Sequence, residues 1–416
     1  MRTSATFFFI FVAGMGFDVS TAKAGGCETL KSSREIIGCV IESHPYIVRE
    51  KSRLKQGNAL GEIALEIPNP EFESRLSYSD NATLGSFSSE VAILQPFELG
   101  GKRSARELKA KADKLLLAAE AISVEEQVVM AALVDLHRLR QLGEEQARLD
   151  EALHTYERIV RQYRIRGRLT PEQEVSLSVF RIAISDLKMR KGLLAADVAD
   201  RQLSLQFAVG KRIEFSDSLL PPGKIEWPAI EEVSGQNEVV GSEVLRSQAA
   251  LALAGAELSL AQANAWPDLR LGPLFQASGQ GAGRVSSLGV ALAMPLPLFN
   301  RNAGLRTYSR AGIEMAGRSY EAVRANVNQR RASLVSRYRN SLEALRESDL
   351  QRLDREHARW DSLFERGVIP SALVIESHRQ VLDFVRSHHQ QQLVTLEALW
   401  GVYALDGTLI EKIQAL

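Results

Sequence analysis

The chain has 416 residues, of which 45% are hydrophobic and 25% charged, so its composition is that of a folded protein large enough for two or three ordinary domains. Its 51 basic residues balance its 51 acidic residues. A balanced charge offers no electrostatic footprint for DNA or RNA, and we expect no nucleic-acid partner.

The first 24 residues have the pattern of a secretory signal peptide. Arg2 precedes the apolar run "ATFFFIFVAGMGF", and Ala22-Lys23-Ala24 forms a small-x-small cleavage site. The run is shorter than the roughly 20 residues that a membrane-spanning helix needs. Since no later stretch is long and apolar enough for such a helix, we expect the exported chain to be soluble, peripheral or a membrane β-barrel.

The two cysteines, Cys27 and Cys39, follow this segment closely. In an exported chain, their spacing favours a small disulfide-closed loop at the mature N-terminus. A lipid-bearing Cys27 is the alternative. Ala24-Gly25-Gly26 lacks the leucine that a lipoprotein signal places three residues before its cysteine, so the disulfide is the favoured interpretation.

Alternating residues after the first helical stretch indicate a β-hairpin. In "EFESRLSYSD" (71–80), Phe72, Leu76 and Tyr78 share one face of an extended strand, and Glu73 and Arg75 share the other. A second alternating run follows a polar link. This pattern fits a half-buried strand of a soluble sheet, and equally a membrane-barrel strand with one face toward lipid and one toward water.

The same arrangement recurs in the second half of the chain. "WPDLRLGPLFQAS" (266–278) is the counterpart of "NPEFESRLSYS" (69–79), and another glycine-bearing link and alternating run follow it. Each hairpin ends at a proline-marked corner, "QPFELGGKR" (95–103) or "MPLPLFNRNAG" (294–304). Proline cannot donate to a strand ladder, so both corners are expected to terminate strands.

A long helix is predicted after each corner, over about 101–166 and about 301–366. A seam with 3-4 spacing in the second stretch predicts coiled-coil packing, through Leu350, Leu353, His357, Trp360 and Phe364. A helix of this length would extend about 100 Å, so it must lie along partner helices.

A tight turn closes each long helix. Gly167 and Gly367, 200 residues apart, suit the left-handed position that ends a helix. Thr170, Pro171 and Gln173 then match the N-cap, first-turn proline and capping-box glutamine of another helix.

Together the patterns predict an α+β membrane protein built from two tandem repeats, each comprising helix, β-hairpin, long helix, turn and helix. The expected divisions are signal peptide 1–24, first repeat 25–209, linker 210–240, second repeat 241–405 and C-terminal tail 406–416. The remaining expected elements are strands at about 70–79, 86–95, 267–277 and 285–295, and helices at about 171–209, 241–265 and 371–405.

Four strands cannot close a membrane barrel, since the smallest such barrels have about eight. We therefore expect several chains to contribute hairpins to one barrel above a tube of their long helices. The side chains expected to face lipid are Phe72, Leu76, Tyr78, Phe87, Val91, Leu269, Leu271, Phe275, Val290 and Leu292. Those expected to line the lumen are Glu73, Arg75, Arg270 and Gln276.

The chain resembles the TolC-type outer-membrane efflux proteins over nearly its whole mature length. The corners "QPFELGGKR" and "PLPLFNRNAG" are most similar to the CzcC-like branch, which serves heavy-metal efflux. The resemblance implies a homotrimer in the outer membrane of a Gram-negative bacterium, with a β-barrel and an α-helical tunnel into the periplasm. It implies a periplasmic adaptor protein and an inner-membrane resistance-nodulation-division pump as partners, and divalent heavy-metal cations as substrates.

By the same resemblance, the two turns are the periplasmic tips that meet the adaptor. The tip residues are Arg166, Gly167, Arg168, Arg366, Gly367 and Val368. Glu365 and Glu376 are the candidates for the acidic constriction of the closed pore. Glu172 and Glu174, at the start of a helix, are at least as well explained by the helix dipole.

Other function classes find less support in the sequence. The chain lacks a GxSxG elbow, an HExxH motif and a P-loop, so we expect no enzyme and no cofactor. Seven histidines without the paired spacing of a closed site make a metal-binding site improbable, despite "SHHQQQ" (387–392). The alternatives that stay open are a type I secretion or drug-efflux duct, with the same architecture, and a periplasmic coiled-coil adaptor or scaffold.

Overall fold

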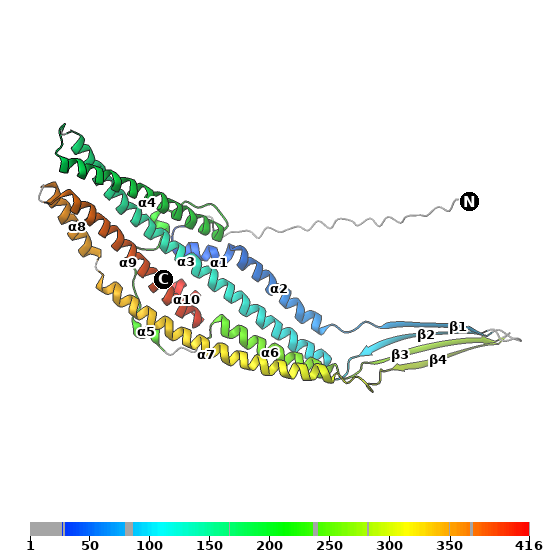
Figure 1. The fold of residues 1–416 in the computed structure, drawn as a ribbon. Coiled ribbons are helices and arrows are strands. Elements are labelled where there is room, and N and C mark those ends of the chain that lie inside the picture. Colours follow the sequence, from blue (N-terminus) through cyan, green and yellow to red (C-terminus); the bar gives the residue numbers. More distant parts are fainter. Residues whose placement is uncertain are drawn as a thin grey trace, which may run out of the picture.

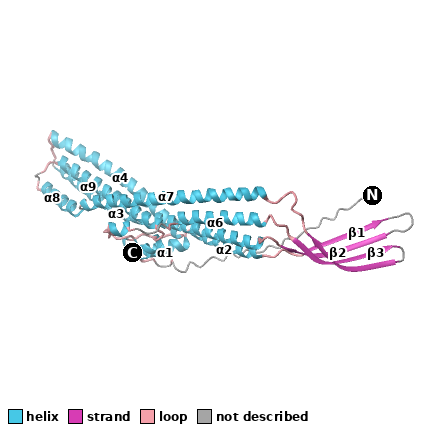
Figure 2. Cartoon of the chain, turned by 90° about the horizontal axis from the view of Figure 1, so that it is seen from below, coloured by secondary structure: helices cyan, strands magenta, loops and turns pink. Residues whose placement is uncertain are grey.

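The computed structural model shows a long bundle of helices from one end of which a four-stranded sheet projects (Figures 1 and 2). The structure describes residues 27, 30–79, 86–165, 167–235, 240–280, 283–348, 350–366 and 369–415. The expected signal peptide lies outside these residues. Within them, no helix is both long and apolar enough to cross a membrane.

The first repeat begins with two helices where one was expected. They are α1 (Ser33–Ser43) and α2 (Pro45–Leu65), and His44 between them is extended, with ψ of 127°. A residue before proline is sterically disfavoured in the helical region, so Pro45 accounts for the interruption. The repeat continues with β1 (Glu71–Ser79), β2 (Ser86–Phe97), α3 (Lys102–Ile165) and α4 (Pro171–Val209).

The linker holds a short 3-10 helix, η1 (Asp217–Leu219), and α5 (Ile230–Ser234). The second repeat then repeats the order of the first. Its elements are α6 (Ser242–Ala263), β3 (Leu269–Gln280), β4 (Gly283–Ala293), α7 (Ala303–Glu347), α8 (Leu350–Glu365) and α9 (Ser371–Leu405). The expected tail contains one more helix, α10 (Leu409–Ala415).

The predicted single helix over 301–366 was wrong, because the structure divides it into α7 and α8. Ser348 is extended there, with φ of −88° and ψ of 110°. Its hydroxyl donates to the Leu345 carbonyl at 2.9 Å and lies 2.9 Å from Nδ1 of His388 on α9. Serine offers the backbone such local alternatives to helix bonding, and here a partner on a neighbouring helix holds the break in place.

All four strands form one antiparallel sheet in the order β1-β2-β3-β4, so the two hairpins lie side by side through β2 and β3. Pairing aligns Tyr78 with Phe87, Val91 with Phe275, and Phe275 with Leu288. Cross-strand partners share a face, so the register gathers the apolar side chains of both hairpins on one surface.

The helical bundle contains two main hydrophobic cores. The body core packs α1, α3, α4, α7 and α9 with the linker and α10; fully buried Tyr338 donates its hydroxyl to the Pro228 carbonyl at 2.7 Å. The tip core packs α3, α4 and α9 around Tyr156 and Phe180, far from the sheet. Cys27 and Cys39 are joined by a disulfide, which secures the chain before α1 to the body core.

The corners between strands and helices are fixed by contacts between the two repeats and, at the second corner, also by a contact within the second repeat. Nζ of Lys102, which starts α3, lies 2.6 Å from Oδ1 of Asp268, just before β3. Gly100 has a positive φ of 72°, and a Cβ there would meet the Trp266 ring at 2.4 Å. Asn302, also left-handed, donates from its side chain to the Ala261 carbonyl at 2.8 Å. The corners therefore set how the two hairpins meet the bundle.

Two adjacent glycines allow the packing at this corner to be tested. Gly100→Ala should lower the thermal unfolding midpoint more than Gly101→Ala. Both residues have positive φ, which costs an alanine about 1–2 kcal/mol, but the Cβ position of Gly101 is open, whereas that of Gly100 collides with Trp266. Equal midpoints for the two variants, measured by circular dichroism, would contradict the close approach.

Candidate functional site

The sheet presents two chemically different faces. One face carries all ten residues expected to contact lipid, and several of them are well exposed in the single chain, including Phe72, Leu76 and Val290. Leu288 of β4, at 82% exposed, belongs to the same face. Large apolar patches of this kind mark a surface that something else covers.

The opposite face carries the four residues expected to line the lumen. Pairing aligns Arg75 with Glu90, and Glu90 with Gln276, in one row across three strands. Arg270 donates to Oε2 of Glu71 at 2.8 Å and lies 3.7 Å from Oε1 of Glu73. Opposite charges thus link β1 to β3 on this face. That it lines a water-filled lumen stays a prediction.

The sheet has two open edges within this chain. β1 and β4 are the outer strands, and each pairs with only one neighbour. An edge strand presents unpaired N–H and C=O groups, which can pair with another chain. Both edge strands border the apolar face. A chain that paired with either edge would therefore also adjoin this face.

The α3–α4 turn forms one tip of the bundle, at the end opposite the sheet (Figure 1). Gly167 has a φ of 61°, and Thr170 and Gln173 form the predicted capping box: the Gln173 N–H donates to Thr170 Oγ1 at 3.3 Å and the Thr170 N–H to Gln173 Oε1 at 3.1 Å. Leu169 packs onto the tip core, which leaves Arg168 exposed.

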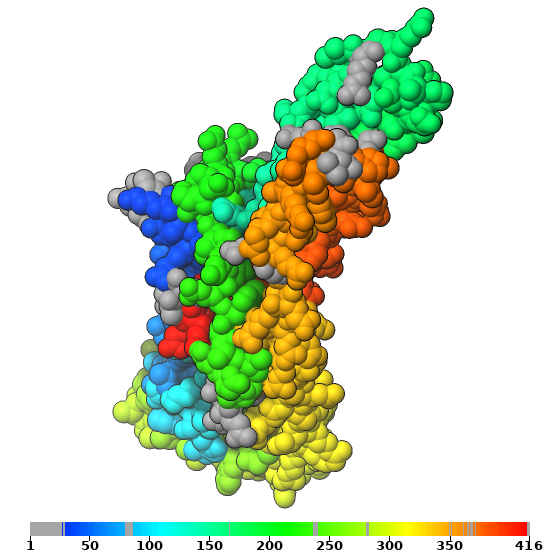
Figure 3. Space-filling view, turned by 90° about the vertical axis from the view of Figure 1, so that its left-hand side faces the viewer, coloured from blue at the N-terminus to red at the C-terminus, as the bar shows by residue number. Residues whose placement is uncertain are grey.

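The α8–α9 turn forms the second tip, beside the first (Figures 1 and 3). Ile369 packs against the same tip core as Leu169. Arg366 is exposed and its guanidinium donates to the Ser362 carbonyl and hydroxyl, both at 3.1 Å. Of the expected tip residues, Arg166, Gly367 and Val368 lie outside the described residues.

The two candidate pore acids lie on different helices, Glu376 on α9 and Glu365 at the end of α8. Glu376 is half-buried on α9 and forms an ion pair with Arg379 at 2.8 Å, and Gln380 donates to it at 2.9 Å. The hydrogen bond from Arg379 holds the pKa of this carboxyl below its usual range. Glu365 ends α8, and its side chain lies outside the described part. Their role in a constriction stays a prediction.

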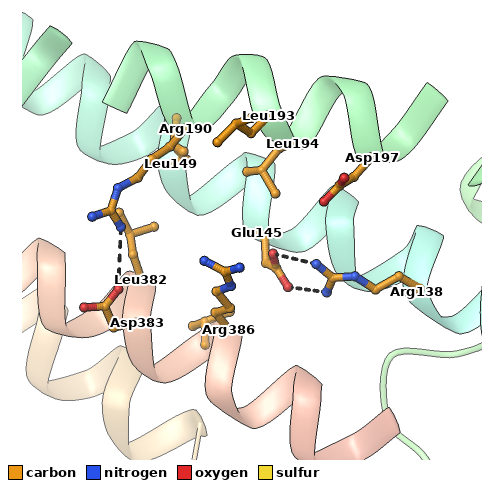
Figure 4. Close-up of a pocket in the computed structure, with 11 residues that line it drawn as sticks. Arg138, Glu145, Leu149, Arg190, Leu193, Leu194, Asp197, Leu382, Asp383 and Arg386 are labelled. Carbon is orange, nitrogen blue, oxygen red and sulfur yellow. Dashed lines mark hydrogen bonds and ion pairs between the residues drawn. The ribbon is translucent and has the colours of Figure 1, made fainter. Parts of the chain in front are cut away.

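A hollow opens between α3, α4 and α9, next to the tip core (Figure 4). Leucine and charged side chains line it together. Its lining residues are Arg138, Glu145, Leu149, Arg190, Leu193, Leu194, Asp197, Leu382, Asp383, Val385 and Arg386. Among the residues that the structure describes, no group of three or more His, Cys, Asp or Glu side chains could hold a metal ion.

Sequence reasoning missed a buried histidine near this hollow. His389, in "SHHQQQ", contacts the adjacent acids Glu144 and Glu145 of α3. The pattern "GEEQ" in a long polar helix looks like a solvated surface, so only the pairing of α3 with α9 could reveal the contact.

Comparison with known proteins identifies the fold. No protein-family model matches the chain, and no curated protein matches it. Solved structures do. The open state of the Neisseria gonorrhoeae MtrE outer membrane channel shares 15% identity, with 91% of this chain and 90% of that chain covered and a TM-score of 0.69. The Campylobacter jejuni CmeC outer membrane channel shares 11%, covering 92% and 89%, with a TM-score of 0.67.

A structure of CusC, from work on its folding and transmembrane channel formation, shares 13% identity with this chain. The match covers 90% of this chain and 92% of that chain, with a TM-score of 0.68. At these identities the likeness concerns the fold. The chain has the TolC-like fold of two tandem repeats, as the sequence predicted.

The tip turn offers a test of its backbone geometry. Gly167→Ala should cost about 1 kcal/mol, because its left-handed φ strains an alanine although the space around it is open. The matched control is Gly192→Ala inside α4, also in open space, which should be neutral or stabilising by up to about 1 kcal/mol. Amide hydrogen exchange should rise around residue 167 in the first variant alone; equal exchange in both variants would contradict the role of Gly167 as a helix-closing residue.

Proposed function

We propose that the protein is the outer-membrane channel of a tripartite export system. In this proposal, three copies pair their sheets edge to edge into one twelve-stranded barrel in the outer membrane of a Gram-negative bacterium, after removal of the signal peptide. Their helices form a coiled-coil tunnel through the periplasm. The duct is passive, with no enzymatic activity and no cofactor.

The single observation that carries this proposal is the sheet. It has one apolar and one charged face, both its edges are open, and it stands at the end of a long helical rod. In lipid every backbone polar group needs a partner, so open edges demand closure by further strands. β1 and β4 run antiparallel, which lets β4 of one copy continue into β1 of the next in the same alternating order.

The proposal extends to the protein's partners and to the substrate that it exports. We propose that the two tips dock a periplasmic adaptor protein, which connects the tunnel to an inner-membrane resistance-nodulation-division pump. Divalent heavy-metal cations are the proposed cargo, on the strength of the CzcC-like corner motifs. A drug-efflux or type I secretion role would use the same channel, so the pump decides between them.

The lipid-facing surface can be tested with two neighbouring residues of β4. Leu288→Arg should reduce outer-membrane oligomer, since an arginine toward lipid near the bilayer midplane costs about 2–4 kcal/mol per chain. Ser287→Arg, on the opposite face one residue earlier, should assemble normally. The readout is the heat-modifiable oligomer in outer-membrane fractions; similar behaviour of the two variants would contradict the face assignment.

Docking at the tips can be tested by site-specific photo-cross-linking. A cross-linker at Arg366 should capture the cognate adaptor, and Arg168→Glu should decrease that capture together with cation resistance while leaving the oligomer intact. Arg34 on α1, away from the tips, is the control position for the cross-linker (Figure 1). Resistance lost with undiminished capture would mean that the tips gate the tunnel rather than bind the adaptor.

Resistance to divalent cations, compared with resistance to organic drugs in cells that carry the cognate pump, tests the cargo separately. Loss of drug resistance alone on deletion of the channel would contradict the heavy-metal assignment while leaving the channel proposal intact.

A further inference from the structure

A polar cluster separates the body core from the tip core. On α3, the body core ends at Leu139 and the tip core begins at Leu149; on α9, the tip core includes Val374 and the body core begins at Leu396. The side chains that meet between the cores, here called the joint, are Gln141, Glu144 and Glu145 of α3 with His388, His389 and Gln392 of α9.

His389 is the centre of the joint. It is 1% exposed, and each of its ring nitrogens faces a different carboxylate. Nδ1 lies 3.0 Å from Oε1 of Glu145, and Nε2 lies 3.3 Å from Oε2 of Glu144. Only the doubly protonated ring has two N–H donors, whereas the neutral ring would turn a lone pair toward one carboxylate. The geometry therefore fits an imidazolium.

Charges from α3 and the segment after α4 surround this contact. Arg138 donates to both oxygens of Glu145, at 2.6 and 3.3 Å, and Arg140 donates to Glu144 at 3.3 Å. Arg140 also lies 3.6 Å from Asp217 of the segment after α4. From α9, Arg386 extends into the hollow near Glu145 (Figure 4).

The other side chains that contact the joint are uncharged polar groups and His388, the neighbour of His389 on α9. Just after α7, the Ser348 hydroxyl contacts Nδ1 of His388, and Nε2 of His388 lies 3.1 Å from Nε2 of Gln392. Gln141 donates to the His389 carbonyl at 3.2 Å, but its buried Oε1 has no hydrogen-bond partner among the described residues. The network is thus only partly satisfied even with the His389 contacts in place.

The joint coincides with the interruption of the long helix. Ser348, which bonds His388, is the residue where α7 ends before α8. At this level ionic and polar contacts link α3 to α9 alongside the buried Leu142 of α3 and Val385 of α9, and the helix beside α9 is broken. A bundle bends most easily where its apolar packing gives way to polar contacts and one of its helices is broken. Here α7 and α8 are separate helices, while α3, α4 and α9 run through the joint.

We propose that the joint is a proton-controlled hinge between body and tips: the protonated His389 clamps α9 to α3, and its deprotonation releases the tip section. The hinge lies within one chain, so the proposal holds whatever the protein exports. Its ligand is the proton, and its moving parts are the helices that carry the two tips.

The direction of the pH dependence follows from the charges. Burial disfavours the imidazolium, but the hydrogen bonds with Glu144 and Glu145 outweigh burial and raise the pKa of His389 above its ordinary value. The clamp is therefore fully present below about pH 6.5 and is lost as the pH rises through the raised pKa. The hydrogen bond with His389 lowers the pKa of Glu144, so the carboxylates lose their contribution only in stronger acid.

Distance measurements across the joint test the hinge in the full-length protein. Nitroxide labels at exposed Gln329 on α7 and exposed Ser178 on α4 report the position of the tip relative to the body. Oligomers diluted with unlabelled chains give the distance within one chain. The distribution should be narrow at pH 5.5 and broaden or shift at pH 8.5.

Three variants decide whether His389 is responsible. His389→Gln should give the released distribution at both pH values. Glu145→Gln should lower the midpoint of the transition by about 1–3 pH units, because a nearby opposite charge is removed. His154→Gln, which changes an exposed histidine of α3, should behave as the unaltered protein.

An unaltered protein with the same distribution at both pH values would overturn the proposal. A pH response that persists in His389→Gln would also overturn it. Where His389→Gln fails to fold, Glu145→Gln remains decisive, since an unchanged midpoint would contradict proton control by this contact. If His389 had only a structural role, His389→Gln would change the distance distribution by the same amount at pH 5.5 and at pH 8.5.

Discussion

The open edges of the four-stranded sheet are the constraint on which the rest of the structure depends. A strand edge in water can be solvated, but an edge beside an apolar face cannot meet lipid without leaving backbone groups unpaired. β1 and β4 both border the surface that carries Phe72 and Leu288. In the proposed trimer, assembly through these edges would pair the backbone and cover the surface in one step. The helices of that trimer must be arranged so that neighbouring copies fit.

That arrangement is set at the corners, where two hairpins distant in sequence become one sheet. β2 and β3 can pair only if both corners hold their strands at the same level. The ion pair of Lys102 with Asp268 and the contact of Gly100 with Trp266 connect the start of α3 directly to the chain before β3. Arg106 reinforces this corner, since it bonds Glu98 and the carbonyls of Ala64 and Glu66. The two repeats are therefore joined directly where the sheet begins.

Much of this architecture was predictable because it depends on short-range patterns. Alternation in 71–79 and 269–277 determines which side chains share a face, and Thr170 with Gln173 determines where α4 begins. The interruptions of the helices were harder to predict from the sequence. Pro45 could have predicted the interruption at His44, but the end of α7 at Ser348 depends on His388, which is 40 residues away in sequence. Likewise, Glu144 and Glu145 look like surface acids until α9 is placed against α3. Local rules find elements and caps; contacts between distant helices need the fold.

The ionic character of the joint is itself informative. Replacing a buried ion pair by well-packed apolar residues is often neutral or stabilising, so stability alone does not explain why the seam between two apolar cores contains Glu145 and His389. Leu139 and Leu149, on either side, show that α3 can present leucine to the cores it serves. An apolar joint would merge body and tips into one rigid core. An ionic joint holds the same alignment, but only while its proton is present, so it makes the connection between the sheet end and the tips conditional on solution chemistry.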